Sequence, residues 1–366
     1  MTDQRKLDIL VLGLSITSSW GNGHATTYRS LIRGLHGRGH RVRFFERESP
    51  WYASTRDLVR SPHCEIVVYE DLPALREYAQ AVGEADLVLV GSYVPDGAEV
   101  AKWVLDTARG VTAFYDIDTP VTMSGLENGG CAYLQADQIP GFDLYLTFNG
   151  GPMLDRLQSE YGARQARPLY CSVDPDVYRP EPDGYPVWHL GYMGTYSDDR
   201  QAGLERLLLE PARRKPRGRF LVVGSKYPDG IEWPANTRRV EHLAPVKHSL
   251  FYNTQRFTLN LTRAAMCEAG WSPSVRLFEA AACATPVISD SWPGIDVFFD
   301  VGTEILLADD CEGVLRLLEE VSEEERRAIG ERARRRVLAA HTAEHRAAEL
   351  ERFAMDARAL QTAAVA

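Results

Sequence analysis

Residues 274–290 read Ser-Val-Arg-Leu-Phe-Glu-Ala-Ala-Ala-Cys-Ala-Thr-Pro-Val-Ile-Ser-Asp, a sequence that predicts an amphipathic helix, a Thr-Pro step and a short buried strand. Arg276 and Glu279 lie three residues apart and would share one face of this helix. Such a pair could bind a polar ligand, because the start of a helix carries partial positive charge that favours phosphate. A surface ion pair on a packing helix fits the same two residues equally well.

The chain on both sides of this segment alternates short apolar runs with helical patterns. In the second half, strands are predicted at 187–193, 220–223, 239–243, 257–261 and 287–289. In the first half, they are predicted at 7–16, 42–45, 65–69, 86–90, 111–115, 142–148 and 166–173, with helices between them, one of them at 72–82. This alternation predicts mostly parallel sheets with helices on both faces. The expected fold class is α/β, with two Rossmann-like domains that face each other across a cleft.

A proline-rich, acidic stretch marks the expected domain boundary. Four prolines fall within twelve residues, at positions 175, 180, 182 and 186. Such a stretch is typical of a stiff linker. We therefore expect a first domain at 1–178, a second at 187–341, and a helix and tail at 342–366 that packs back toward the first domain, with its last five residues frayed.

Composition excludes several classes of protein. The chain of 366 residues carries a formal charge of −10, which argues against a general nucleic-acid binder. No apolar run approaches the roughly 20 residues of a membrane span, so no stable membrane insertion is expected. The first residues have no signal-peptide layout, and the six cysteines include no Cys-x-x-Cys pair. These features predict a cytoplasmic protein with free thiols and no metal site.

Two groups of polar residues in the first half follow predicted strands. The loop at 17–24 contains Gly21-x-Gly23 and His24, but it lacks the third glycine of a dinucleotide-binding fingerprint. Asp116 and Asp118 come directly after the strand at 111–115, where parallel sheets bind ligands. The two acids could instead serve only turn geometry, which aspartate favours.

Taken together, these motifs resemble the GT-B glycosyltransferases, and more narrowly the spore-maturation-protein-like branch of the group 1 glycosyltransferases. Glu279, the small residues after it and Thr285-Pro286 match the second half of that group's Glu-x7-Glu motif. Trp271 stands where the first Glu is expected, and Ala284 stands where the group has Gly. In the first half, His24 matches the position that often supplies the catalytic base in inverting members. His40 matches a structural Gly-His element.

The resemblance implies transfer of a sugar from a UDP-, GDP- or TDP-linked donor to an acceptor, with no further cofactor and no metal. Glu279 would hold the nucleotide ribose. The other residues expected to bind the nucleotide sugar are Arg276, Arg263, Gly194, Thr195, Arg200, Ser274 and Gly23. The expected catalytic residues are His24, Asp116 and Asp118. In an inverting enzyme, His24 would take the acceptor proton, whereas in a retaining enzyme the departing phosphate would take it.

Other functions fit parts of the same pattern. Asp116-Ile-Asp118 is formally an Asp-x-Asp sequence, so a metal-dependent donor site is a competing interpretation. A sugar-nucleotide epimerase, a phosphorylase-like enzyme and a non-catalytic sugar-nucleotide-binding protein would all share the fold. A Rossmann dehydrogenase is disfavoured, since Gly-x-Gly-x-x-Gly follows neither first strand.

Overall fold

The structure is a computed structural model that describes residues 5–20, 23–181 and 185–365. Gly21, Pro182 and Asp183, which belong to the loop and linker discussed above, lie outside the described residues. The chain divides into two compact units, one made of Met1–Cys171 with Ala343–Ala366 and the other of Ser172–Thr342. The first unit therefore ends at residue 171, whereas the sequence pattern placed the end of the first domain at 178.

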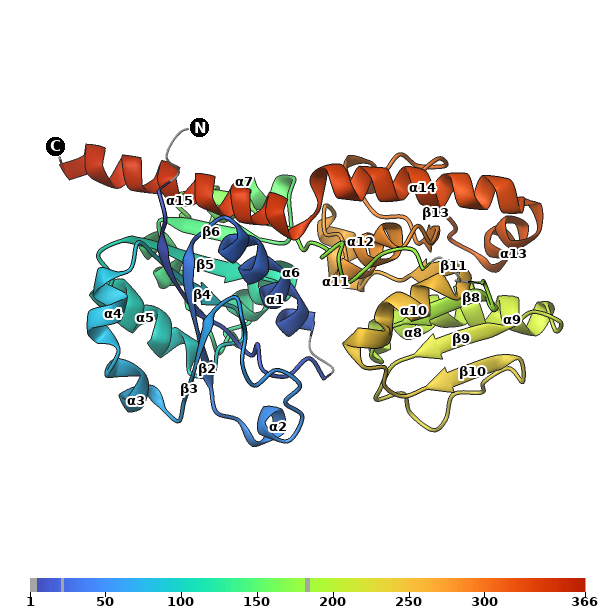
Figure 1. Cartoon of the computed structure of the whole chain (residues 1–366), viewed down its shortest axis with the longest axis horizontal. Coiled ribbons are helices and arrows are strands. Elements are labelled where there is room, and N and C mark those ends of the chain that lie inside the picture. The colour runs from blue at the N-terminus through green and yellow to red at the C-terminus, as the bar shows by residue number, and fades with distance from the viewer. Residues whose placement is uncertain (1–4, 21–22, 182–184, 366) are drawn as a thin grey trace. The chain divides into compact units, whose positions relative to one another are not determined.

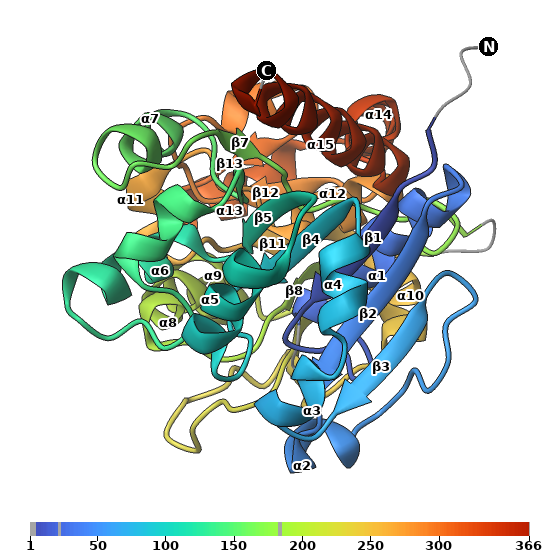
Figure 2. The same cartoon turned by 90° about the vertical axis from the view of Figure 1, so that its left-hand side faces the viewer.

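The first unit is built on a seven-stranded sheet with the order β3-β2-β1-β4-β5-β6-β7, in which every pairing is parallel. Strands β4, β5 and β6 are buried along their whole length, because helices cover both faces. Figures 1 and 2 show these helices around the sheet. The strands are β1 (Asp8–Leu12), β2 (Arg41–Arg47), β3 (Glu65–Tyr69), β4 (Leu87–Gly91), β5 (Val111–Asp116), β6 (Leu144–Thr147) and β7 (Ala166–Pro168).

The helices of the first unit depart from the sequence pattern in two places. The single helix expected at 72–82 is two helices, α3 and α4, with Tyr78 between them. The expected fraying of the last residues is wrong, because α15 continues to Val365. The helical segments are α1 (Gly23–Gly37), α2 (Pro50–Ala53), α3 (Leu72–Arg76), α4 (Ala79–Glu84), α5 (Gly97–Thr107), α6 (Thr119–Glu127), η1 (Ala136–Gly141), α7 (Pro152–Ser159) and α15 (Ala343–Val365).

Helix α15 packs on α1 within the first unit, although it is the last helix of the chain. The two backbones approach so closely at Gly34 that an added Cβ would lie 2.4 Å from the carbonyl oxygen of Ala343. A buried cluster fixes the contact further along: Glu351 accepts a hydrogen bond from Arg38 and lies 3.3 Å from His40 Nε2. His40 thus has the structural role expected for it.

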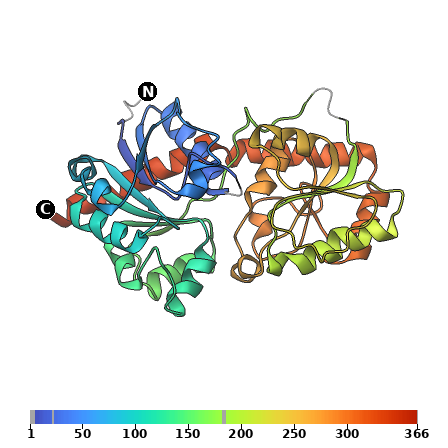
Figure 3. The same ribbon diagram turned by 90° about the horizontal axis from the view of Figure 1, so that it is seen from below.

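The second unit is a six-stranded parallel sheet with the order β10-β9-β8-β11-β12-β13. Figure 3 shows helices on both sides of it. The strands are β8 (Trp188–Met193), β9 (Phe220–Val223), β10 (Thr237–Val240), β11 (Gln255–Asn260), β12 (Val287–Ser289) and β13 (Leu306–Leu307). The helical segments are α8 (Asp198–Leu204), η2 (Glu205–Leu209), α9 (Glu210–Arg214), η3 (Pro245–Lys247), α10 (His248–Asn253), α11 (Ala264–Ala269), α12 (Val275–Ala282), η4 (Ile295–Val297), α13 (Cys311–Glu320) and α14 (Glu323–Ala340).

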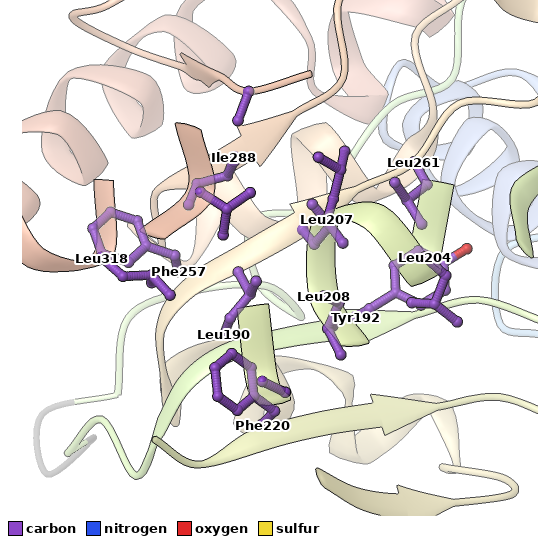
Figure 4. Close-up of a cluster of buried hydrophobic side chains, with 14 of the residues drawn as sticks. Leu190, Tyr192, Leu204, Leu207, Leu208, Phe220, Phe257, Leu261, Ile288 and Leu318 are labelled. Atoms are coloured by element: carbon purple, nitrogen blue, oxygen red, sulfur yellow. The ribbon is translucent and has the colours of Figure 1, made fainter. Parts of the chain in front are cut away.

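The core of the second unit lies between this sheet and the helix that follows β8. One turn of that helix, η2, is π-helical, and Leu207, Leu208 and Leu209 are all fully buried in it. Figure 4 shows Leu207 and Leu208 among side chains of the strands, with Phe220 and Phe257 nearby. This packing fixes the strand ends that carry the polar residues described next. The expected α/β fold class is confirmed.

Candidate functional site

Arg276 lies at the start of α12 and reaches the carboxyl ends of two strands. Its Nε donates to the carbonyl oxygen of Met193 at 2.7 Å, and one terminal nitrogen donates to Asn260 Oδ1 at 2.8 Å. The guanidinium also lies over the ring of Tyr192, 4.9 Å from the ring centre. Only 8% of the residue is exposed, so the positive charge is held in a fixed place. Ser274 supports it by donating to the same Asn260 oxygen at 2.8 Å.

Gly194, which follows β8, leaves room beside Arg276. An added Cβ at this position would lie 3.1 Å from a terminal nitrogen of Arg276 and 2.4 Å from the hydroxyl oxygen of Tyr192. The amide of Gly194 already donates to the carbonyl oxygen of Val223 at 2.9 Å. Its part in a ligand site would therefore be close approach of the backbone, not donation of a hydrogen bond.

Three arginines gather around Tyr227, whose hydroxyl donates to the Gly194 carbonyl at 3.1 Å. Burial raises the pKa of Tyr227, while the charges of Arg200, Arg276 and Arg239 act to lower it. Among the described residues, no ion pair joins these three arginines to an Asp or Glu, although the charge of Arg200 acts on Asp199 and that of Arg276 acts on Asp290. Arg276 is buried, and a buried guanidinium without a close carboxylate is unusual, because a buried charge is costly unless it is paired. The cluster therefore has the character of an anion site.

Arg239 and Tyr227 were not among the residues expected from the sequence. The Arg239 guanidinium lies between two rings, 4.6 Å from the centre of Tyr227 and 4.4 Å from that of Trp233. Its Nε is buried and makes no hydrogen bond in the part of the chain that the structure describes, and the same holds for Nε of Arg200. Arg200 otherwise donates to the Thr195 carbonyl at 2.7 Å, so Thr195 helps to hold it.

Arg263 has a different environment from the three arginines of the cluster. Its Nε lies 3.6 Å from a carboxylate oxygen of Asp199, which also accepts from the backbone N–H of Ala264 at 3.1 Å. Hydrogen bonds and the charge of Arg263 hold the pKa of Asp199 below its usual value, although burial opposes them. Since an acid already neutralises Arg263, it is a weaker candidate for binding an anion.

Glu279 lies one turn further along α12 and is 4% exposed. Its Oε2 accepts a hydrogen bond from the Tyr252 hydroxyl at 2.8 Å. The nearby carboxylate also adds to burial in raising the pKa of Tyr178. Arg276 and Glu279 share a helix face, but the structure gives no ion pair between these two described residues. The surface ion-pair interpretation is therefore wrong: Arg276 turns to the strand ends and Glu279 turns to the tyrosines.

Trp271 and Ala284, the two departures from the family motif, both have left-handed backbone conformations. Trp271 has φ 45° and donates its backbone N–H to the Pro293 carbonyl at 2.7 Å. Its indole packs where a Cβ on Gly294 would be, since an added Cβ there would lie 2.5 Å from the ring. Ala284 has φ 54°, a conformation that a glycine would adopt without strain. A glycine preference at position 284 thus has a backbone cause.

In the first unit, Asp116 closes β5 and is fully buried. Tyr145 donates to one of its oxygens at 2.6 Å and Thr122 donates to the other at 2.8 Å. Burial is the main cause that raises the pKa of Asp116 to about 6, although these hydrogen bonds oppose it. A second hydrogen bond links Thr122 to the Tyr133 hydroxyl at 2.8 Å.

His24, in the first turn of α1, lies beside Asp118, with 4.0 Å between Nε2 and a carboxylate oxygen. Burial lowers the pKa of His24, and the charge of Asp118 opposes this. The imidazole is therefore neutral near pH 7 and can accept a proton. Tyr93 completes the group, since its ring centre lies 5.3 Å from that of His24 and 4.6 Å from that of Tyr133.

The structure thus brings together the three residues expected to be catalytic, His24, Asp116 and Asp118, within one unit. Gly23 precedes His24, and an added Cβ there would meet no atom within 4 Å. Tyr93 and Tyr133 were missed, although Tyr93 follows β4 just as Asp118 follows β5. A search for polar and aromatic residues after every predicted strand would have found Tyr93.

Comparisons with known proteins concern the fold and the second half of the chain. Residues 200–352 match the family model described as glycosyl transferase-like. Sucrose-phosphate synthase from Thermosynechococcus elongatus has a similar structure, with TM-score 0.69 and 16% identity over 99% of this chain and 100% of that one. HepE from Anabaena, solved with UDP and glucose, has a TM-score of 0.68 and 14% identity, over 94% of this chain and 98% of that one. An α-glucosyltransferase solved with UDP and a 13-mer DNA has a TM-score of 0.73 and 12% identity, over 96% of this chain and 100% of that one. No curated protein matches the sequence.

Residues 200–352 are similar to glycosyl transferase-like proteins, and the chain as a whole has the α/β fold of the GT-B glycosyltransferases. The prediction of this fold is confirmed, and the match over residues 200–352 agrees with the prediction of a glycosyltransferase. The narrower assignment to the spore-maturation-protein-like branch stays a prediction. No helix among the described residues is long and apolar enough to cross a membrane.

The contacts of Asp116 disfavour the metal-dependent interpretation of Asp116-Ile-Asp118. Both oxygens of Asp116 already accept hydrogen bonds from hydroxyl groups. Across residues 5–20, 23–181 and 185–365, no group of three or more His, Cys, Asp or Glu side chains is placed to hold a metal ion. The six cysteines are all free thiols.

Replacing Asp116 with Asn is expected to change how stability depends on pH. Between its unfolded value and about 6, the folded wild-type protein binds more protons at Asp116 than the unfolded chain does. The wild type therefore loses stability relative to the Asn variant as pH rises through this window, by about 3 kcal/mol in all. Urea unfolding of both proteins from about pH 4 to pH 7 measures the difference. A free-energy difference that does not change with pH would contradict this assignment.

Proposed function

We propose that this protein transfers a glycosyl group from a nucleotide-sugar donor to a hydroxyl group of an acceptor, and that Arg200, Arg239 and Arg276 bind the donor diphosphate. The observation that supports this most strongly is the gathering of three arginines without carboxylate partners, in a chain whose formal charge is −10. Two of them each have a buried Nε without a hydrogen bond in the described part of the chain. A diphosphate would supply the missing acceptors.

The chemistry requires stabilisation of negative charge on the leaving nucleoside diphosphate. As the bond between sugar and phosphate breaks, charge develops on the phosphate oxygens, and fixed cations stabilise it without reorganisation. Arg276 is already held by Met193 and Asn260, so little conformational entropy is lost when it binds phosphate. We propose that this cluster replaces a metal ion, so that the reaction proceeds without one, and that the protein acts in the cytoplasm.

The acceptor end of the reaction falls to the first unit in this proposal. His24 is neutral near pH 7 and would accept the proton of the attacking hydroxyl in an inverting reaction, with Asp118 stabilising the imidazolium. In a retaining reaction, the departing phosphate would take that proton, and His24 would contact the acceptor. The loss of turnover on removing His24 distinguishes the two cases.

Glu279 is proposed to accept hydrogen bonds from the ribose hydroxyls, as the resemblance implies. Replacing Glu279 with Gln retains an acceptor for Tyr252 and removes the charge. We expect at least about a 10-fold loss of affinity for the nucleoside diphosphate, because hydrogen bonds to a charged group contribute about 1.5–3 kcal/mol. Calorimetric titration with UDP, GDP and TDP, and then with their sugars, measures this loss and identifies the base.

Glu351→Gln is a matched control, because Glu351 is also 4% exposed but lies in the first unit. It should leave nucleotide affinity unchanged. Equal affinities of wild type and Glu279→Gln for every nucleotide would remove Glu279 from the site. Conversion of the donor without an acceptor would indicate an epimerase, and tight binding without turnover would indicate a binding protein.

A further inference from the structure

We propose that the acceptor is an uncharged polyhydroxyl compound, a sugar, which Asp118 binds through a hydroxyl and Tyr93 contacts through its ring. This inference rests on the proposed function, because it concerns the second substrate of that reaction.

In the described part of the chain, the arginines around His24 are paired with acids, whereas Asp118 is not paired with a cation. Three arginines at this end of the first sheet are each paired with an acid: Arg29 with Asp57, Arg47 with Asp96, and Arg56 with Glu48. Asp118, by contrast, has no Lys or Arg partner among the described residues, and its side chain is 26% exposed. The cluster around Tyr227 in the second unit differs, because no ion pair with an Asp or Glu of the described residues is formed by Arg200, Arg239 or Arg276.

This difference determines which acceptors can bind. A phosphate or carboxylate on the acceptor would approach the Asp118 carboxyl group, which has no paired Lys or Arg among the described residues to offset the repulsion. A neutral hydroxyl group can instead donate a hydrogen bond to that carboxylate, and such charge-assisted bonds are roughly twice as strong as neutral ones. The first unit therefore favours an uncharged acceptor.

The backbone of Tyr93 is strained. It has φ 64°, a left-handed conformation that costs an L-residue roughly 1–2 kcal/mol and that glycine would adopt freely. Neighbouring contacts hold it there, since the hydroxyl of buried Ser92 accepts the N–H of Ile117 at 3.1 Å. A tyrosine in this conformation is strained where glycine would not be, which is consistent with a use for its ring.

The side chains of Asp118 and Tyr93 together suit a sugar. The Tyr93 ring is partly exposed and is fixed between His24 and Tyr133. A pyranose ring has apolar C–H faces that pack on an aromatic ring and hydroxyl groups around its rim that bind carboxylates. Tyr93 would thus act as a positioning residue that sets the sugar hydroxyl against His24.

The test compares acceptors that differ only in charge. Methyl glucoside, glucose 6-phosphate and glucuronate, with further neutral sugars and their phosphorylated forms, are titrated at millimolar concentrations into the full-length protein saturated with the nucleoside diphosphate. Ligand-observed NMR reports binding. We expect neutral sugars to bind at least 10-fold more tightly than their charged forms. Tighter binding of the charged forms, or no binding of either class, would overturn the proposal.

Variants locate the effect. Tyr93→Asn tolerates the left-handed backbone and removes the ring, so the acceptor Kd should rise at least 10-fold with donor affinity unchanged. Asp96→Asn is the control for the Kd of the neutral acceptor only, because Asp96 is also left-handed, with φ 52°, but its replacement leaves Arg47 without its acid. Asp118→Asn should narrow the preference for neutral sugars. An unchanged acceptor Kd in Tyr93→Asn, or an unchanged preference in Asp118→Asn, would overturn the assignment.

Donor binding is measured in the same samples, and it distinguishes failure of the acceptor assignment from failure of the proposed function. If the protein binds nucleoside diphosphates but prefers charged acceptors, the acceptor assignment is wrong and the proposed function stands. If no nucleotide binds, the proposed function itself is wrong.

Discussion

Replacing Arg276 with Met is expected to lower kcat/KM by about 10²–10³-fold, the usual effect of removing one fixed group that stabilises transition-state charge. Arg276 is the best-positioned cation of the cluster, since the backbone of β8 and the Asn260 side chain hold it on two sides. The affinity for the nucleoside diphosphate should fall in parallel. Steady-state kinetics with the preferred donor and calorimetric titration with its diphosphate measure the two quantities.

Loss of Arg276 also leaves Asn260 and the Met193 carbonyl without their donor, so a control must separate folding from binding. Arg326 is equally buried, at 8% exposure, but pairs with Glu323 at 2.9 Å. Arg326→Met should lower the melting temperature with little change in diphosphate affinity. Arg276→Lys should restore part of the activity, because it keeps the charge but cannot make both hydrogen bonds. Equal losses of diphosphate affinity in both Met variants would contradict the role of Arg276.

Replacing His24 with Ala is expected to lower kcat by about 10²–10⁴-fold if the reaction inverts, the range typical of a general base. Donor affinity should not change, because the residues proposed to bind the donor belong to the other unit. The pKa of His24 lies below its usual value, so wild-type turnover should stay high near pH 7 and fall as protonation begins at lower pH. In the His24→Ala variant, turnover should no longer fall as the pH decreases.

His36→Ala is the matched control, since His36 lies in the last turn of the same helix and is exposed. Its effect on kcat should be negligible. Turnover of His24→Ala close to wild type would exclude His24 as the base and favour a retaining reaction, in which the leaving phosphate accepts the proton.

The sequence predicted what depends on local pattern. Alternating apolar runs and helical periods gave the two parallel sheets, because a strand buried on both faces needs a continuous apolar run. Arg276 was found because it opens the predicted helix at 274–282, and Arg200 because it follows the Gly194-Thr195 turn. Asp116 was found because it comes directly after a predicted strand. Its burial was not predicted, since Tyr145, which covers it, lies 29 residues further along the chain.

The residues that were missed are defined by contacts between distant segments. Arg239 sits inside a short strand of mixed polarity, and only the fold places it between Tyr227 and Trp233. Tyr93 is marked by its backbone conformation, which no residue-type pattern shows for a tyrosine. The break between α3 and α4 escaped detection because the apolar spacing continues across Tyr78.

The position of α15 has a consequence for how the chain is made. The first unit combines residues synthesised before Ser172 with residues synthesised after Thr342, and the whole second unit emerges between them. Since domains generally fold as units, from the N-terminal end during synthesis, the second unit can complete its sheet on the ribosome while the first still lacks α15. Until then, the face of α1 around Gly34 stays uncovered, as does the buried side of His40. The first unit therefore reaches its final form only after the second unit has been synthesised.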